Sequence, residues 1–102
     1  MGFGIRREEE AIVVEGPVTF ATAPTLFAAA IEAMAWDDRE VRVDLTRVTE
    51  ADSAAVSLLI HWWREARRRG LAFAVLHPPK SVAGLARVYG VDRLLGLPGS
   101  DA

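Results

Sequence analysis

The chain has 102 residues, 51% of them hydrophobic and 25% charged, which is the size and composition of one compact domain with a single core. Twelve basic residues against 14 acidic ones leave a formal net charge of −2, so the electropositive surface of a nucleic-acid-binding domain is absent. Because there is no cysteine, and His61 and His77 lack ligand-type neighbours at metal-binding spacing, we predict no disulfide, metal or other cofactor.

The N-terminal segment predicts a soluble, cytoplasmic chain. It becomes charged at Arg6-Arg7-Glu8-Glu9-Glu10, before any apolar run could serve as a signal peptide. No later apolar run is long enough to cross a bilayer. We therefore expect no direct insertion into a membrane.

The first half of the chain predicts two strands separated by a helix. Residues 11–14 form an apolar strand that stops at Gly16-Pro17. A helix includes Pro24 in its first turn, where no backbone N–H is needed. Alternation of apolar and polar residues at 41–45 then predicts a central strand. The predicted core stripe of the helix consists of Leu26, Phe27, Ala30, Ile31 and Met34.

The second half predicts two helices around one strand. A helix from about Ser53 to Arg69 ends at Gly70, and the apolar run 71–76 is interpreted as a strand buried on both faces. The last helix, at about residues 80–89, is followed by a short turn at 91–95. Core stripes are predicted at Ala55, Leu58, Leu59, Trp62 and Ala66 of the first of these helices, and at Val82, Leu85, Ala86 and Tyr89 of the second, with the Tyr89 hydroxyl at the surface.

This order of elements predicts an α/β fold. Strands that alternate with helices need crossover connections, so the sheet is expected to be at least partly parallel and covered by the helices. We expect a single domain over residues 1–102, with a core from about 11 to 95 and a loose C-terminal tail at 96–102.

The turn between the central strand and the second helix contains Asp52-Ser53. Both residue types are good helix N-caps, because their side-chain oxygens accept hydrogen bonds from unpaired N–H groups of the first turn. Alternatively, Ser53 is a phosphorylation site, since the helix N-terminus favours an anion, although Asp52 beside it repels one. The sequence leaves both interpretations open.

The polar residues do not predict an enzyme. Ser53 and Ser57 lie at helical spacing from His61, but they lack a nucleophile elbow and an oxyanion site, and residues on one rigid helix rarely converge on a substrate. The glycines are scattered, with no phosphate-binding loop among them. We therefore predict no catalytic residue.

The second helix is left with a surface that its core stripe does not use, and we predict that this surface binds a partner. Trp63 is either an exposed contact anchor or partly covered by neighbouring elements. The arginines at 64 and 67–69 form either a solvated helix end or a contact for an acidic partner or anionic lipid. The predicted partner-binding residues are Asp52, Ser53, Ser57, Ile60, His61, Trp63 and Arg64.

Two segments carry a resemblance to a known family. Val43-Asp-Leu-Thr-Arg-Val-Thr-Glu-Ala-Asp-Ser53 with its following helix, and Leu85-Ala-Arg-Val-Tyr-Gly-Val-Asp-Arg-Leu-Leu95, resemble the STAS domain of anti-sigma factor antagonists over residues 11–95. The resemblance implies a mixed β-sheet covered by α-helices that docks on partner proteins. Ser53 matches the serine or threonine that several subfamilies phosphorylate.

Within that family, two subfamilies compete. Antagonists usually carry a glycine after the serine, whereas this chain has Asp52-Ser-Ala-Ala55. Leu58-Leu-Ile-His-Trp62 and Leu85-Ala-Arg-Val-Tyr-Gly90 are instead similar to the MlaB family. That resemblance implies a non-enzymatic subunit of a phospholipid ABC transporter that maintains outer-membrane lipid asymmetry. It also implies binding to the MlaF-like ATPase, in a complex with the membrane permease at the inner membrane, with Ser53 as a contact. The alternative is an anti-sigma factor antagonist switched at Ser53.

Overall fold

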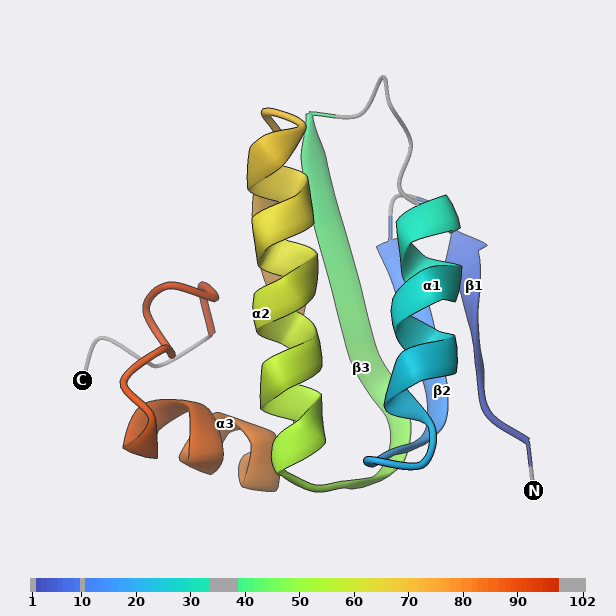
Figure 1. Cartoon of the computed structure of the whole chain (residues 1–102), viewed down its shortest axis with the longest axis vertical. Coiled ribbons are helices and arrows are strands. Elements are labelled where there is room, and N and C mark those ends of the chain that lie inside the picture. The colour runs from blue at the N-terminus through green and yellow to red at the C-terminus, as the bar shows by residue number, and fades with distance from the viewer. Residues whose placement is uncertain (1, 10, 34–38, 98–102) are drawn as a thin grey trace.

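The computed structural model describes residues 2–9, 11–33 and 39–97. In these ranges a sheet forms one layer, and α1 and α2 lie side by side across one of its faces, with α3 beside the start of α2 (Figure 1). The elements in chain order are β1 (Gly4–Glu8), β2 (Ala11–Val18), α1 (Ala23–Ala33), β3 (Glu40–Ala51), α2 (Ser53–Arg68), β4 (Ala72–Leu76) and α3 (Lys80–Val88).

The sheet is mixed, as predicted. Its strand order is β1-β2-β3-β4, with β1 antiparallel to β2 and the other pairs parallel. The helices α1 and α2 are the crossover connections that parallel neighbours require. The prediction of a central strand at 41–45 is confirmed, because β3 lies between β2 and β4.

The core fills the space between the sheet and the helices. Alternate residues Val41, Val43 and Leu45 of β3 point into it, and the whole predicted stripe of α2 is buried. The largest buried side chain, Trp62, also donates its indole N–H to the carbonyl of Phe27 at 3.3 Å, which joins α2 to α1. The predicted stripe of α1 is only partly confirmed: Leu26 and Ala30 are buried, Phe27 is exposed, and Met34 lies outside the described residues.

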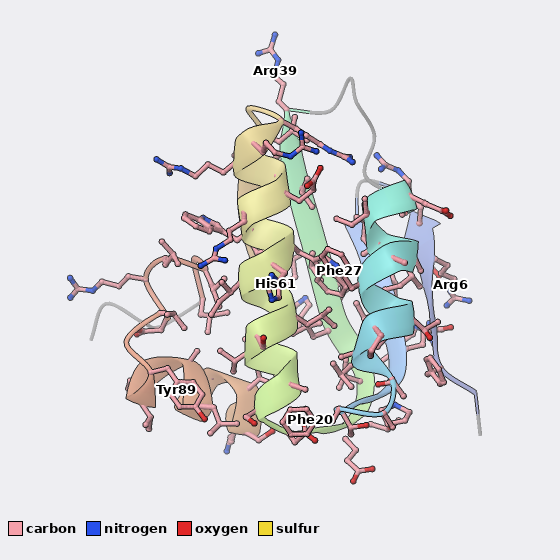
Figure 2. The ribbon with its side chains drawn as sticks, in the orientation of Figure 1. Arg6, Phe20, Phe27, Arg39, His61 and Tyr89 are labelled. Carbon is pink, nitrogen blue, oxygen red and sulfur yellow. The ribbon has the colours of Figure 1, made fainter. Side chains whose placement is uncertain are left out.

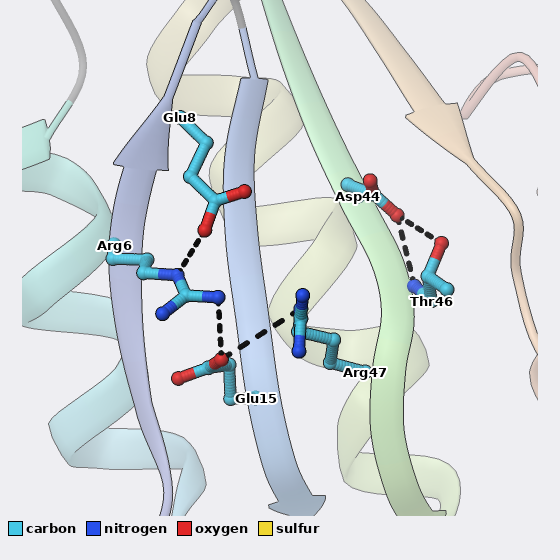
Figure 3. Close-up of polar contacts among 6 residues, drawn as sticks. All are labelled: Arg6, Glu8, Glu15, Asp44, Thr46 and Arg47. Atoms are coloured by element: carbon cyan, nitrogen blue, oxygen red, sulfur yellow. Dashed lines mark hydrogen bonds and ion pairs between the residues drawn. The ribbon is translucent and has the colours of Figure 1, made fainter.

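The opposite face of the sheet is charged (Figure 3). Arg6 of β1 pairs with Glu8 of the same strand and, at 3.1 Å, with Oε1 of Glu15 on β2. The same Glu15 oxygen lies 3.8 Å from Nε of Arg47 on β3. On β3, the Asp44 carboxylate accepts from the backbone N–H of Thr46 at 2.9 Å and from its hydroxyl. Because none of the three helices covers this face, polar residues alternate with core residues along the strands.

Two strand predictions need correction. The strand β1 was not predicted, because Ile5 is its only large apolar residue and its order comes from pairing with β2. The strand β4 is not buried on both faces. It lies at an edge of the sheet with Ala72 exposed and only Val75 fully buried, since the helices cover one face alone.

The end of the chain also differs from the prediction. Tyr89 is not inward: it is 54% exposed, because α3 ends at Val88 and Tyr89 is its C-cap. The core is completed instead by Leu95 and Leu97, and the latter is only 4% exposed. Packing therefore continues two residues beyond the predicted core boundary at 95, while tail residues 98–102 lie outside the described ranges.

The last turn of α2 contains a carboxylate held by two arginines. Glu65 accepts from Nε of Arg68 at 3.2 Å and from Nε of Arg69 at 2.7 Å. The hydrogen bond from Arg68 holds the pKa of Glu65 below its ordinary value of 4.5, against the opposing effect of desolvation, and Arg69 adds to the lowering. The cluster fixes the end of the helix that precedes Gly70.

The stabilisation by Glu65 is expected to depend on pH. A carboxylate whose pKa is lower in the folded chain than in the unfolded one stabilises the fold above the unfolded value of 4.5, and this is lost as the pH falls through the folded value. Glu65→Gln should lower Tm by about 2–4 °C at neutral pH, with the difference disappearing in strong acid. Thermal unfolding of both proteins across the pH range measures this. A constant difference at all pH values would mean that packing, not charge, is lost.

Candidate docking surface

The helix α2 begins at the point where the sequence analysis placed its cap. Asp52 has an extended backbone, with φ −121°, and its carboxylate accepts from the backbone N–H of Ala54 at 2.8 Å. The capping interpretation is thus confirmed for Asp52 alone. Ser53 is the first residue of the helix, half-buried, and its hydroxyl makes no hydrogen bond within the described part of the chain. That hydroxyl is available for contact.

Asp52 also joins the helix to the loop between β2 and α1. Its second carboxylate oxygen accepts from the backbone N–H of Phe20 at 3.4 Å. The loop itself is closed by Thr22, whose hydroxyl donates to the carbonyl of Pro17 at 2.8 Å and accepts from the N–H of Thr19 at 3.0 Å. Phe20 is 71% exposed on this hydrogen-bonded loop, beside the start of α2 (Figure 2). The hydrogen bonds of the loop therefore fix the backbone of Phe20 while its aromatic ring stays exposed to solvent.

Removing the Asp52 carboxylate should destabilise the domain. Asp52→Ala leaves two backbone N–H groups without their acceptor, so we expect a loss of about 1–2 kcal/mol in the free energy of unfolding, measured by urea denaturation. Asp52→Asn keeps the cap oxygen and is the control, with an expected loss of a few tenths of a kcal/mol. Equal losses in the two variants would show that charge, not the cap, is responsible.

The structure brings the predicted partner-binding residues onto one face of α2 and its N-terminus. Steps of three and four residues place them on the side opposite Leu59 and Trp62. Ser57, His61 and Arg64 are exposed, whereas Asp52, Ser53, Ile60 and Trp63 are partly buried.

Trp63 combines the two interpretations left open by the sequence. Its ring packs against the core, and the Arg67 guanidinium lies over it at 5.4 Å from the centroid. The remaining surface of the ring stays accessible, so Trp63 is a partly covered residue at the margin of the face. Ile60 has the same character, since it also packs against the core.

A groove lies between α1 and α2, on the side of α2 away from Trp63. It has a volume of about 420 Å³, and Phe27 meets His61 across it with ring centroids 5.9 Å apart in an edge-to-face arrangement (Figure 2). The lining residues are Phe20, Ala23, Pro24, Phe27, Ala54, Ser57, Leu58 and His61.

Two residues of this surface were not recognised from the sequence. Phe20 is an apolar residue in a loop, and only its position before Thr22 and a helix start could have drawn attention to it. Phe27 follows the helical apolar spacing, but it is 38% exposed and lines the groove. Both residues are identified as part of this surface only by the packing of α1 on α2, which creates the groove that they line.

The described residues do not assemble a catalytic arrangement. His61 contacts a phenylalanine ring, and no hydrogen bond joins it to Ser53 or Ser57 in the part of the chain that the structure describes. In the same ranges, no three His, Asp or Glu side chains gather as metal ligands, and no helix has the length and apolar character of a membrane span. The surface can bind by shape, apolar contact and charge.

The fold is shared with several solved structures. The anti-sigma factor antagonist SpoIIAA, in its unphosphorylated form, superposes with a TM-score of 0.63 at 16% identity, over 94% of this chain and 100% of that one. A sulfate transporter family protein from Wolinella succinogenes gives 0.67 at 17% identity, over 85% and 70%. Mglu gives 0.56 at 22% identity over 74% of this chain, which spans only 19% of Mglu.

These similarities, together with the mixed sheet, show that the chain shares its fold with these structures. The family model described as "Mlab, STAS domain" matches residues 1–96, so the chain belongs to the MlaB family of STAS domains. The resemblance drawn from the sequence motifs is thereby confirmed. No curated protein matches the chain.

Proposed function

We propose that this chain is a non-enzymatic accessory subunit that binds and supports the ATPase of an Mla-type phospholipid ABC transporter. The observation that carries the proposal is membership of the MlaB family over residues 1–96. The complex with the membrane permease would hold the chain at the cytoplasmic side of the inner membrane. Its role there would be to support the lipid transport that maintains outer-membrane asymmetry.

The proposed contact is the outer face of α2 together with the exposed ring of Phe20. Interfaces are dominated by a few aromatic and arginine residues. The proposed contact offers Phe20 from the loop, and Trp63 and Arg64 from α2. The loop that carries Phe20 is already ordered by hydrogen bonds, so little conformational entropy is lost when it binds. Ser53 lies between the loop and the rest of the face.

A charge at Ser53 should weaken docking without weakening the fold. Ser53→Glu places a carboxylate at a helix N-terminus, where the dipole favours it, yet burial of that charge at an interface is costly. We expect the Kd for the ATPase subunit to rise at least tenfold, while the Tm of the isolated chain stays unchanged. Co-purification and calorimetry with the ATPase of the native host measure binding, and thermal unfolding measures Tm.

Two variants control this experiment. Ser53→Ala removes only the hydroxyl and should bind within a factor of about three of wild type. Ser81→Glu makes the same change in the first turn of α3 and should bind normally. Unchanged binding of Ser53→Glu would remove Ser53 from the contact, and weakened binding of Ser81→Glu would mean that the net charge of the chain is responsible.

The second candidate function is an anti-sigma factor antagonist that is switched by phosphorylation of Ser53. The likeness to SpoIIAA over nearly the whole chain supports a shared fold with such an antagonist. The sequence Asp52-Ser-Ala-Ala55 lacks the glycine usual after the serine, which favours the transporter role. Genomic neighbourhood separates the two candidates, because lipid-transporter genes beside this one support the first, and sigma-factor or kinase genes support the second.

A further inference from the structure

The groove between α1 and α2 has the properties of a small-molecule site. Its volume of about 420 Å³ falls in the range of ligand pockets, which is about 300–1,000 Å³. Six of its eight lining residues are apolar, and two phenylalanines expose their rings beside it. On α2 the lining runs only from Ala54 to His61, about 10 Å of helix axis, which suits a short chain molecule better than a long partner helix.

One end of the groove is followed by positive charge. Arg64 comes one turn after His61 on α2, about 4.5 Å further along the axis. It is exposed and has no ion-pair partner among the described residues. Beyond it, Arg68 and Arg69 both donate to the carboxylate of Glu65.

At its other end the groove is bordered by a carboxylate and not by an arginine. There the Asp52 carboxylate lies beside the loop of Phe20, to whose backbone N–H it is hydrogen-bonded. Arg64 is then the charged group that an anionic head can bind, and this orients a ligand with an apolar tail. Its tail lies toward Phe20, and its head lies toward Arg64.

We propose that this groove binds a fatty acid, with the alkyl chain between Phe27 and Leu58 and the carboxylate at Arg64. A single chain suits the volume of the groove, and a carboxylate is a matched acceptor for an unpaired guanidinium. Ser57 and His61 provide the polar rim between the two parts. This inference goes beyond the proposed docking function and does not rest on it, because the binding is a property of the isolated chain.

Chain length tests the apolar part of the site. Isothermal titration calorimetry of the isolated protein with octanoate, decanoate and dodecanoate, each below its micelle concentration, should show saturable binding of one molecule. The affinity should rise about two- to fourfold for each added methylene, as burial of a methylene predicts. Absence of saturable binding, or affinities that do not depend on chain length, would overturn the proposal.

Matched variants place the ligand in this groove. Ser57→Trp fills the groove from an exposed helix position and should weaken decanoate binding at least tenfold, whereas Ser81→Trp on α3 should bind as wild type does. Circular dichroism verifies that both variants are folded. Equal binding by the two variants would overturn the placement.

The charged end is tested with an uncharged ligand of the same length. Arg64→Gln should weaken binding of decanoate about three- to tenfold and leave binding of decanol unchanged, while Arg87→Gln on α3 makes the same charge change and should alter neither. An equal effect on decanoate and decanol would overturn the role of Arg64. Tighter binding of a lysophospholipid than of a fatty acid of equal chain length would overturn the assignment of a carboxylate head.

Discussion

Replacing Trp62 with alanine is expected to lower the free energy of unfolding by about 3–5 kcal/mol, a large part of the total stability of a small domain. The side chain is only 1% exposed and is the largest fully buried one in the core. Its removal leaves a cavity between α2 and the sheet, and it also deletes the hydrogen bond to the carbonyl of Phe27. Urea denaturation followed by circular dichroism measures the loss.

Trp62→Phe separates the two contributions. Phenylalanine keeps most of the apolar volume but cannot donate to Phe27, so a smaller loss of about 1–2 kcal/mol is expected. A loss below about 1 kcal/mol for the alanine variant would contradict the central position of Trp62 in the core. Such a result would also undermine the assignment of the outer face of α2, since both rest on the same helical phase.

The helix α2 could be predicted from the sequence because all of its signals are local. A capping residue at 52, apolar residues at helical spacing and Gly70 after the last turn fix its start, its phase and its end. The observed helix, Ser53–Arg68, ends one residue before the predicted boundary. Once the phase is right, the outer face that carries Ser57, His61 and Arg64 follows directly.

The edges of the sheet could not be predicted in this way, because their order depends on partners distant in the sequence. An apolar run such as β4 shows that a strand is buried, but not whether one or two layers of helix cover it. The pattern of β1 is mostly charged, since Arg6 and Glu8 point to the uncovered face, where they pair. Strand pairing with β2, rather than apolar burial, gives this segment its structure.

The candidate site also contains residues that local signals predict and residues that depend on distant contacts. Ser53 and its neighbours on α2 were found from spacing within one helix. Phe20 and the groove arise where a loop and α1 meet α2, and the hydrogen bond from Phe20 to Asp52 spans 32 residues. No local sequence pattern predicts this contact between distant segments. From the sequence alone, Phe20 therefore cannot be distinguished from an ordinary loop residue.

Replacement of Gly16 with alanine is expected to cost about 2–4 kcal/mol and to loosen β1 from β2. Gly16 has φ +86°, a conformation that residues with a Cβ adopt at a cost. An added Cβ would lie 2.6 Å from the carbonyl oxygen of Gly2 and 2.8 Å from Cβ of Phe3, so the chain that leads into β1 would have to move. Amide hydrogen exchange along β1, together with urea denaturation, measures both effects.

The matched control for this variant is Gly84→Ala. Gly84 lies within α3, where an added Cβ meets nothing within 4 Å, so the same substitution should stabilise the domain by up to about 1 kcal/mol through higher helix propensity. If Gly16→Ala were as stable as wild type, the segment that leads into β1 would not lie against Gly16. Faster exchange in β1 with little change in α2 is the expected result. It would show that the close approach of Gly2 and Phe3 to this glycine helps to hold β1 on the sheet, and that the docking face on α2 is stable without it.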